Sequence, residues 1–165
     1  MRNYLIILFI LITYSCNDTA ANTKLEEQYQ HALDLRKNKQ FMLSINIFEN
    51  IFTNYPISQY APLSMYQIGD IYLNEIKNYE LAIEKFINVY EKFPNSESAK
   101  ISIFLCGYIS NNYLQEFSDA FTYYTKFKEV YPDDSLVFSV DYELYDPLSG
   151  LINHIEVLDS LNNLY

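Results

Sequence analysis

Glycine and proline are scarce in this chain, with 3 Gly and 5 Pro among 165 residues. Few turns can depend on either residue, which argues against a turn-rich β protein. The chain has instead 17 Tyr and 11 Phe, and half of its residues are hydrophobic. This composition suits long helices that share one continuous core, and it argues against disorder.

Cysteine and histidine are also scarce. The two cysteines, Cys16 and Cys106, differ in their sequence settings, which argues against a disulfide framework. Cys106 falls within a helical pattern and is interpreted as a small buried hydrophobic residue. His31 and His154 are far apart and have no Cys, Asp or second His at ligand spacing. We therefore expect no metal site and no cofactor.

The common catalytic and phosphate-binding motifs are missing. The sequence has no Gly-rich phosphate loop, no Gly-x-Ser-x-Gly elbow and no His-Glu-x-x-His pair. The carboxylate pairs Glu26-Glu27 and Asp133-Asp134 lie at predicted helix starts, where acidic side chains favour the helix dipole and stay in solvent. Missing motifs leave an enzyme unsupported without excluding it. We expect a protein that is not an enzyme.

Positive charge is in short supply, with 11 Lys and Arg against 21 Asp and Glu, so the formal net charge is -10. Such a surface repels nucleic acid and anionic lipid head groups. We therefore expect no nucleic-acid partner. A basic or neutral protein is the easier partner to accommodate.

The first residues resemble a bacterial lipoprotein signal. Residues 1–3 carry a positive charge, residues 4–12 are apolar, and Ser15 precedes Cys16. The apolar run is shorter than the roughly 20 residues that cross a bilayer as a helix, and its layout is that of a secretory signal. The match has one departure, since Thr13 stands where such signals carry Leu, Val or Ile. An ordinary cleaved signal with an incidental cysteine is the alternative.

The lipoprotein resemblance implies a signal peptide at residues 1–15 and lipid attachment at Cys16. Residues 16–23 would then be a polar tether. Several acyl chains anchor a protein far more firmly than one. The implied location is the outer membrane, facing the periplasm.

A repeat of 38 residues organises the chain, because the aromatic-Pro pairs end at Pro56, Pro94 and Pro132. Other residues keep the same step: Phe41, Tyr79 and Phe117; Ser44, Ala82 and Ala120; Phe48, Phe86 and Tyr124; Gly69 and Gly107. A period of this length indicates an array whose units bury their apolar faces by stacking on neighbours.

Each repeat is predicted to form a helical hairpin. Helical spacing predicts helices over residues 25–37 and 41–54, then from Ser58 to Tyr72 and from Tyr79 towards Phe93. In the third repeat, residues 112–115 are predicted to form the turn. Glycine within a helix costs about 1 kcal/mol relative to alanine. We therefore expect Gly69 to let the two helices of its hairpin approach closely.

These repeats resemble the tetratricopeptide repeat family. The motif is followed well in the second repeat by Gly69, Tyr72, Ala82, Phe86, Val89 and Pro94. It is followed less closely elsewhere, and Ser110 replaces an aromatic residue. The period exceeds the roughly 34 residues usual for the family, and we place the extra residues in the turns. The resemblance implies an all-α, right-handed solenoid of about three hairpins over residues 24–132.

The pattern decays after Pro132. Residues 135–144 are compatible with the start of a fourth hairpin, but Tyr145 replaces the glycine and Pro147 follows. Residues 133–165 are therefore predicted to form an incomplete repeat and a C-terminal capping helix. The apolar residues of that helix are Leu148, Leu151, Ile152, Ile155, Leu158 and Leu161. Docking of this helix on a partner is the alternative.

The resemblance also implies a site, because first helices line a concave groove in tetratricopeptide repeat proteins. The predicted groove residues are Tyr66, Asp70, Asn74, Phe104, Tyr108, Asn111 and Asn112. Aromatic and amide side chains of this kind suit peptide recognition. Packing of Tyr66 and Phe104 between hairpins is an equal alternative.

Envelope members of the family share the lengthened Tyr-Pro turn at residues 55–61. They include the BamD lipoprotein family of outer-membrane β-barrel assembly and the periplasmic division coordinator of the Tol system. The implied function is a lipid-anchored, BamD-like protein-binding scaffold with β-barrel assembly components as partners. Scaffolds of secretion, gliding or cell-wall and division systems are the alternative, and an envelope enzyme comes third.

Overall fold

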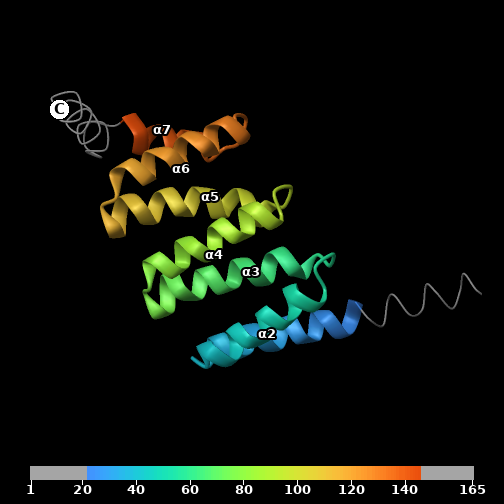
Figure 1. The fold of residues 1–165 in the computed structure, drawn as a ribbon. Helices are drawn as coiled ribbons and strands as arrows, with labels where there is room; N and C mark the ends of the chain where they lie inside the picture. The colour runs from blue at the N-terminus through green and yellow to red at the C-terminus, as the bar shows by residue number, and fades with distance from the viewer. Residues whose placement is uncertain (1–21, 146–165) are drawn as a thin grey trace, which may run out of the picture. The chain divides into compact units, whose positions relative to one another are not determined.

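The computed structural model describes residues 22–145, and every regular element among them is a helix. Residues 22–37 form the first helix, followed by the elements shown in Figure 1: α2 (Phe41–Asn54), α3 (Tyr60–Ile71), α4 (Tyr79–Lys92), α5 (Glu97–Ile109), α6 (Phe117–Val130) and α7 (Val137–Tyr145). Two π-helical turns continue first helices, η1 (Tyr72–Ile76) after α3 and η2 (Ser110–Leu114) after α5. The all-α array of tetratricopeptide-like hairpins is confirmed.

Several sequence predictions lie outside the described residues. These are the signal peptide at residues 1–15, the lipid site at Cys16 and the capping helix after Pro147. Most of the tether at residues 16–23 lies outside them as well.

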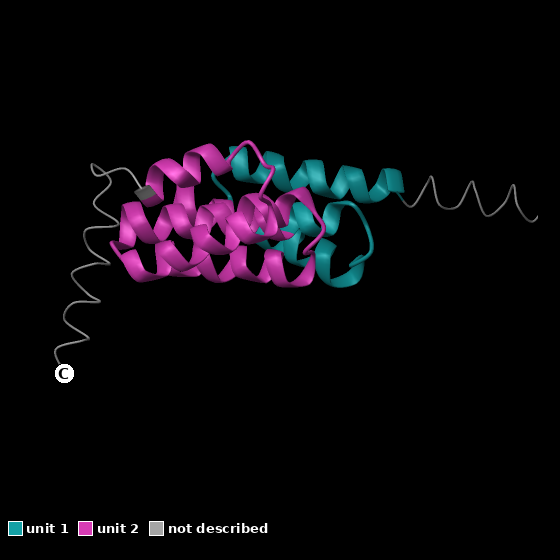
Figure 2. Ribbon diagram, turned by 90° about the horizontal axis from the view of Figure 1, so that it is seen from above, with its two compact units in different colours: residues 1–64 teal, residues 65–165 magenta. Residues whose placement is uncertain are grey.

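The chain divides into two compact units, whose boundary falls between Ser64 and Met65 (Figure 2). In the first unit, Tyr29 contacts Phe48 of α2 with ring centroids 5.4 Å apart. The buried hydroxyl of Ser44 donates to the carbonyl of Ala32 at 2.7 Å. These contacts join the two helices of the first hairpin.

In the second unit, α4, α5, α6 and α7 pack in sequence order, each against the next (Figure 1). One buried cluster joins Phe86 and Leu73 to Cys106 and Ile109. Another joins Tyr124 and Phe127 to residues of α7, including Val140. The helix α7 therefore packs against the second helix of the third hairpin. Cys106 is fully buried, which confirms its interpretation as a core residue.

The same turn follows each aromatic-Pro pair. In every case the aromatic N–H donates to the carbonyl four residues earlier, and the residue three positions later donates to the aromatic carbonyl. The first bonds are Tyr55 to Ile51, Phe93 to Val89 and Tyr131 to Phe127, at 2.9, 2.9 and 2.8 Å. Proline has no N–H and disfavours helix in the residue before it. The three pairs thus end three helices in one way.

The turn inside each hairpin ends on a non-glycine residue in the left-handed region. Lys39, Lys77 and Gln115 have φ of 60°, 59° and 59°. In the second and third hairpins a π-helical turn precedes this residue. The N–H of Asn78 donates to the carbonyl of Tyr72 at 2.9 Å, and the N–H of Glu116 donates to the carbonyl of Ser110 at 2.8 Å. The predicted turn at residues 112–115 is therefore wrong for 112–114, which are still helical in η2. One extra residue widens the helix rather than lengthening the turn.

Two glycines bring the helices of a hairpin close together. A Cβ on Gly69 would lie 2.8 Å from ring atoms of Phe86, and a Cβ on Gly107 would lie 2.7 Å from the ring of Tyr124. Both rings are fully buried, so neither can move aside freely. The expected role of Gly69 is confirmed, and Gly107 has the same role.

We predict that Gly69→Ala destabilises the protein by about 1–3 kcal/mol, because overpacking outweighs the gain in helix propensity. Urea denaturation followed by circular dichroism measures the loss. Adding Phe86→Leu, which removes the ring, should shrink the effect of the alanine. An equal loss in both backgrounds would show that the ring contact is not its cause.

Candidate functional site

All seven predicted groove residues lie in the second unit, on α3, η1, α5 and η2. Tyr66 and Phe104 are half-buried. The ring of Tyr66 contacts Phe86 at 5.5 Å, and that of Phe104 contacts Tyr124 at 6.0 Å and Phe127 at 5.9 Å. One face of each ring therefore packs on the second helix of its own hairpin. Their role in binding stays a prediction.

The polar groove residues are held by local hydrogen bonds. The Asn74 amide donates to Asp70 Oδ1 at 2.7 Å, and the exposed Asn112 amide donates to the Tyr108 carbonyl at 3.0 Å. Each bond joins residues four positions apart, so the side chains lie along the helix surface. The amide oxygens are not used in these bonds and can accept from a peptide backbone.

Asn111 differs from its neighbours because it is buried, with 8% of its surface exposed. Its amide donates to Glu143 Oε2 of α7 at 2.7 Å. The contact joins the third hairpin to α7. The sequence prediction missed Glu143, because it considered the residues of each repeat without those of the next.

Three tyrosines meet beside this pair. Tyr113 of η2 stacks on Tyr79, the first residue of α4, with centroids 4.5 Å apart and planes at 21°. It meets Tyr108 edge to face at 5.9 Å and 73°. Because 45% of Tyr113 is exposed, this aromatic surface reaches solvent.

The electrostatics of this region favour uncharged tyrosines. Desolvation raises the pKa of Tyr108, and the neighbouring Tyr113 and Glu143 raise it further. Burial also raises the pKa of Tyr124 far above its usual value, with smaller contributions from Glu143 and Tyr108. The Tyr124 ring lies against Gly107, one helical turn before Asn111.

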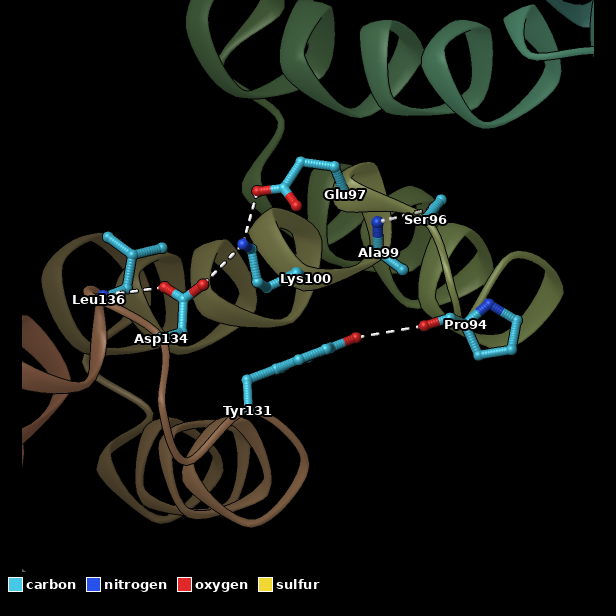
Figure 3. Close-up of polar contacts among 8 residues, drawn as sticks. All are labelled: Pro94, Ser96, Glu97, Ala99, Lys100, Tyr131, Asp134 and Leu136. Atoms are coloured by element: carbon cyan, nitrogen blue, oxygen red, sulfur yellow. Dashed lines mark hydrogen bonds and ion pairs between the residues drawn. The ribbon is translucent and has the colours of Figure 1, made fainter.

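A cavity of about 600 Å³ lies between the turns after Phe93 and Tyr131. Figure 3 shows the Lys100 ammonium between the carboxylates of Glu97 and Asp134, at 2.6 Å from each. Asp134 also accepts from the Leu136 N–H at 2.9 Å, and the Tyr131 hydroxyl donates to the Pro94 carbonyl at 3.3 Å. These contacts tie neighbouring turns together.

The ion pair in this cavity shifts the pKa values of both of its partners. The hydrogen bond to Asp134 raises the pKa of Lys100, with Glu97 next in importance. The hydrogen bond from Lys100 lowers the pKa of Asp134, and the Leu136 N–H adds to this effect. The cation is already shared by two carboxylates, so the cavity is poorly suited to an anion. We interpret the residues that line this cavity as a structural contact between the two turns.

Within residues 22–145, no group of His, Cys, Asp and Glu side chains could hold a metal ion. No helix in this part of the chain is both long and apolar enough to span a membrane. Burial raises the pKa of the Cys106 thiol well above its usual range, and the side chain lies 3.9 Å from the Ile83 carbonyl. A buried thiol of this kind is unreactive.

Comparison with known proteins agrees with the hairpin geometry. Residues 63–96 match the tetratricopeptide repeat family. This chain contains a tetratricopeptide repeat. The matched segment covers most of α3, all of η1 and α4, and Gly69 with its Phe86 contact. Such repeats commonly serve as protein-interaction scaffolds. No curated protein matches the sequence.

We predict that Asp134→Asn lowers the stability of the protein at pH 7 and that this loss of stability disappears in acid. The folded-state pKa of Asp134 lies below the ordinary value of 3.8. Its contribution is therefore fully present above about pH 4 and is lost as the pH falls through the folded pKa. Urea midpoints of the variant and wild type should differ at pH 7 and converge near pH 2. The neighbouring exposed Asp133→Asn is the control, and an equal change there would contradict a specific Lys100 pair.

Proposed function

We propose that this chain is a lipid-anchored, protein-binding scaffold of the bacterial cell envelope. The observation that carries the proposal is the tetratricopeptide repeat with aromatic and amide side chains on the surface of its first helices. Tyr108, Asn112 and Tyr113 provide contact area and hydrogen-bonding groups at solvent. An extended or helical peptide is the natural ligand for such a surface.

The narrower form of the proposal is a BamD-like role in outer-membrane protein assembly. It is supported by the lipoprotein-like residues 1–16 and by the repeated Tyr-Pro turn. In this form the protein faces the periplasm and its partners are β-barrel assembly components.

A scaffold of another envelope complex, such as a secretion, gliding or cell-wall and division system, is the second candidate. Co-purification from detergent-solubilised membranes separates the two candidates. A β-barrel assembly protein should accompany the first, and its consistent absence beside another complex would favour the second.

We predict that Cys16→Ala releases the protein from membranes, because the acyl chains are its anchor. Fractionation into membrane and soluble pools, followed by immunoblotting, measures the release. Cys106→Ala is the matched control, since that thiol is buried in the core. If Cys16→Ala leaves membrane retention unchanged, the protein is not a lipoprotein.

We predict that Asn112→Ala weakens partner capture severalfold while stability stays within about 0.5 kcal/mol of wild type, as expected for a surface substitution. Asn88→Ala is a matched control, because Asn88 also donates to the carbonyl four residues earlier but lies on the second helix α4. Quantitative co-purification and urea denaturation provide the two readouts. Equal capture of the partner by both variants would argue against a binding role for the surface of the first helices.

A further inference from the structure

At three positions, residues that lie 38 apart in successive repeats differ in a coordinated way. Stepping 38 residues along the chain exchanges three apolar residues for polar ones. Leu73 becomes Asn111, Phe86 becomes Tyr124 and Leu105 becomes Glu143. The glycine that contacts the ring is kept at both places, as Gly69 and Gly107. The contact between glycine and ring is thus kept, while three nearby side chains change from apolar to polar.

The three earlier residues belong to the core. Leu73 and Phe86 are buried in one cluster, and Leu105 packs against it. Phenylalanine at position 86 therefore shows that the fold needs no hydroxyl at this point of a hairpin.

The residues 38 positions later form a polar group. Asn111 donates to Glu143 at 2.7 Å. The Tyr124 side chain is fully buried, and its hydroxyl has no hydrogen-bond partner. A buried polar group without a partner destabilises the folded state. Three polar substitutions gathered at one place, at such a cost, indicate a binding role rather than a packing role.

The surroundings of this polar group select the charge of a ligand. The Asn111 amide holds the half-buried Glu143 carboxylate in position. The exposed ring of Tyr113 lies beside Tyr108. A carboxylate next to aromatic rings attracts a cation through both its charge and the ring faces, and it repels an anion.

We infer that Tyr108, Asn111, Tyr113, Tyr124 and Glu143 form a subsite for an arginine or lysine side chain of a bound protein. Arginine suits it best, because its several N–H groups can bond Glu143 and also give the Tyr124 hydroxyl a partner. That hydroxyl is closed to solvent in the unbound chain, so the guanidinium reaches it only when the side chains that cover it move aside. The inference rests on the proposed protein-binding function and names the chemistry of the partner. The net charge of -10 assists approach of a basic segment.

The test uses a random 12-residue peptide library displayed on phage and panned against the full chain in detergent. The expected result is a set of binders that are weakened by Asn112→Ala and share a basic residue at one position. Replacing that residue by citrulline, which keeps the shape of arginine without its charge, should weaken a synthetic peptide at least tenfold. Comparable affinity of both peptides would overturn the inference.

Three variants assign the effect to the subsite. Glu143→Gln should remove the preference for arginine over citrulline. Glu129→Gln, an exposed α6 residue, removes the same charge elsewhere and should keep the preference. The triple variant Asn111→Leu, Tyr124→Phe and Glu143→Leu installs the residues found 38 positions earlier, Leu73, Phe86 and Leu105. It should stay folded, with a raised Tm, and bind both peptides alike.

The outcomes separate this inference from the proposed function. Binders that are sensitive to Asn112→Ala but show no basic preference would leave the protein-binding function intact and refute the subsite. A library that yields no Asn112-sensitive binder would count against both. Loss of the preference in Glu129→Gln as well would assign it to net charge and also refute the subsite.

Discussion

The close contact between a glycine and an aromatic ring is the constraint on which the second and third hairpins depend. In the second and third hairpins, the first helix passes over the ring of the second helix with no room for a Cβ. In the first hairpin, Ala32 and Ser44 make a related contact through a buried hydrogen bond. Once this distance is fixed, the neighbouring apolar residues can form shared clusters, and each aromatic-Pro turn delivers the chain to the next helix.

This constraint also explains why the polar residues of the third hairpin are tolerated. The Tyr124 ring fills the same space as Phe86, so the hairpin closes whether or not a hydroxyl is attached. The cost of burying the hydroxyl is local, because units in an array contact only their neighbours. A repeat can therefore acquire a polar group for recognition while the others keep an apolar core.

Much of the fold follows from the sequence, since the 38-residue spacing, the aromatic-Pro pairs and the two glycines each have a direct physical meaning. The π-helical turns could not be predicted in this way. The period of 38 is the same whether an extra residue lengthens a turn or widens the last turn of a helix. The hydrogen bonds from Asn78 to Tyr72 and from Glu116 to Ser110 decide between these possibilities.

The candidate site was predictable only in part, for a related reason. The residues of the first helices could be assigned from the family pattern, but their partners come from other helices. Asn111 looks like an exposed groove residue when α5 and η2 are considered alone, and it is buried because α7 brings Glu143 to it. A clue was present in the sequence, because comparing hairpin with hairpin shows leucine at both equivalent positions, Leu73 and Leu105. In a repeat protein, a pair of positions that change from apolar to polar together indicates a contact between them, even before the contact is seen.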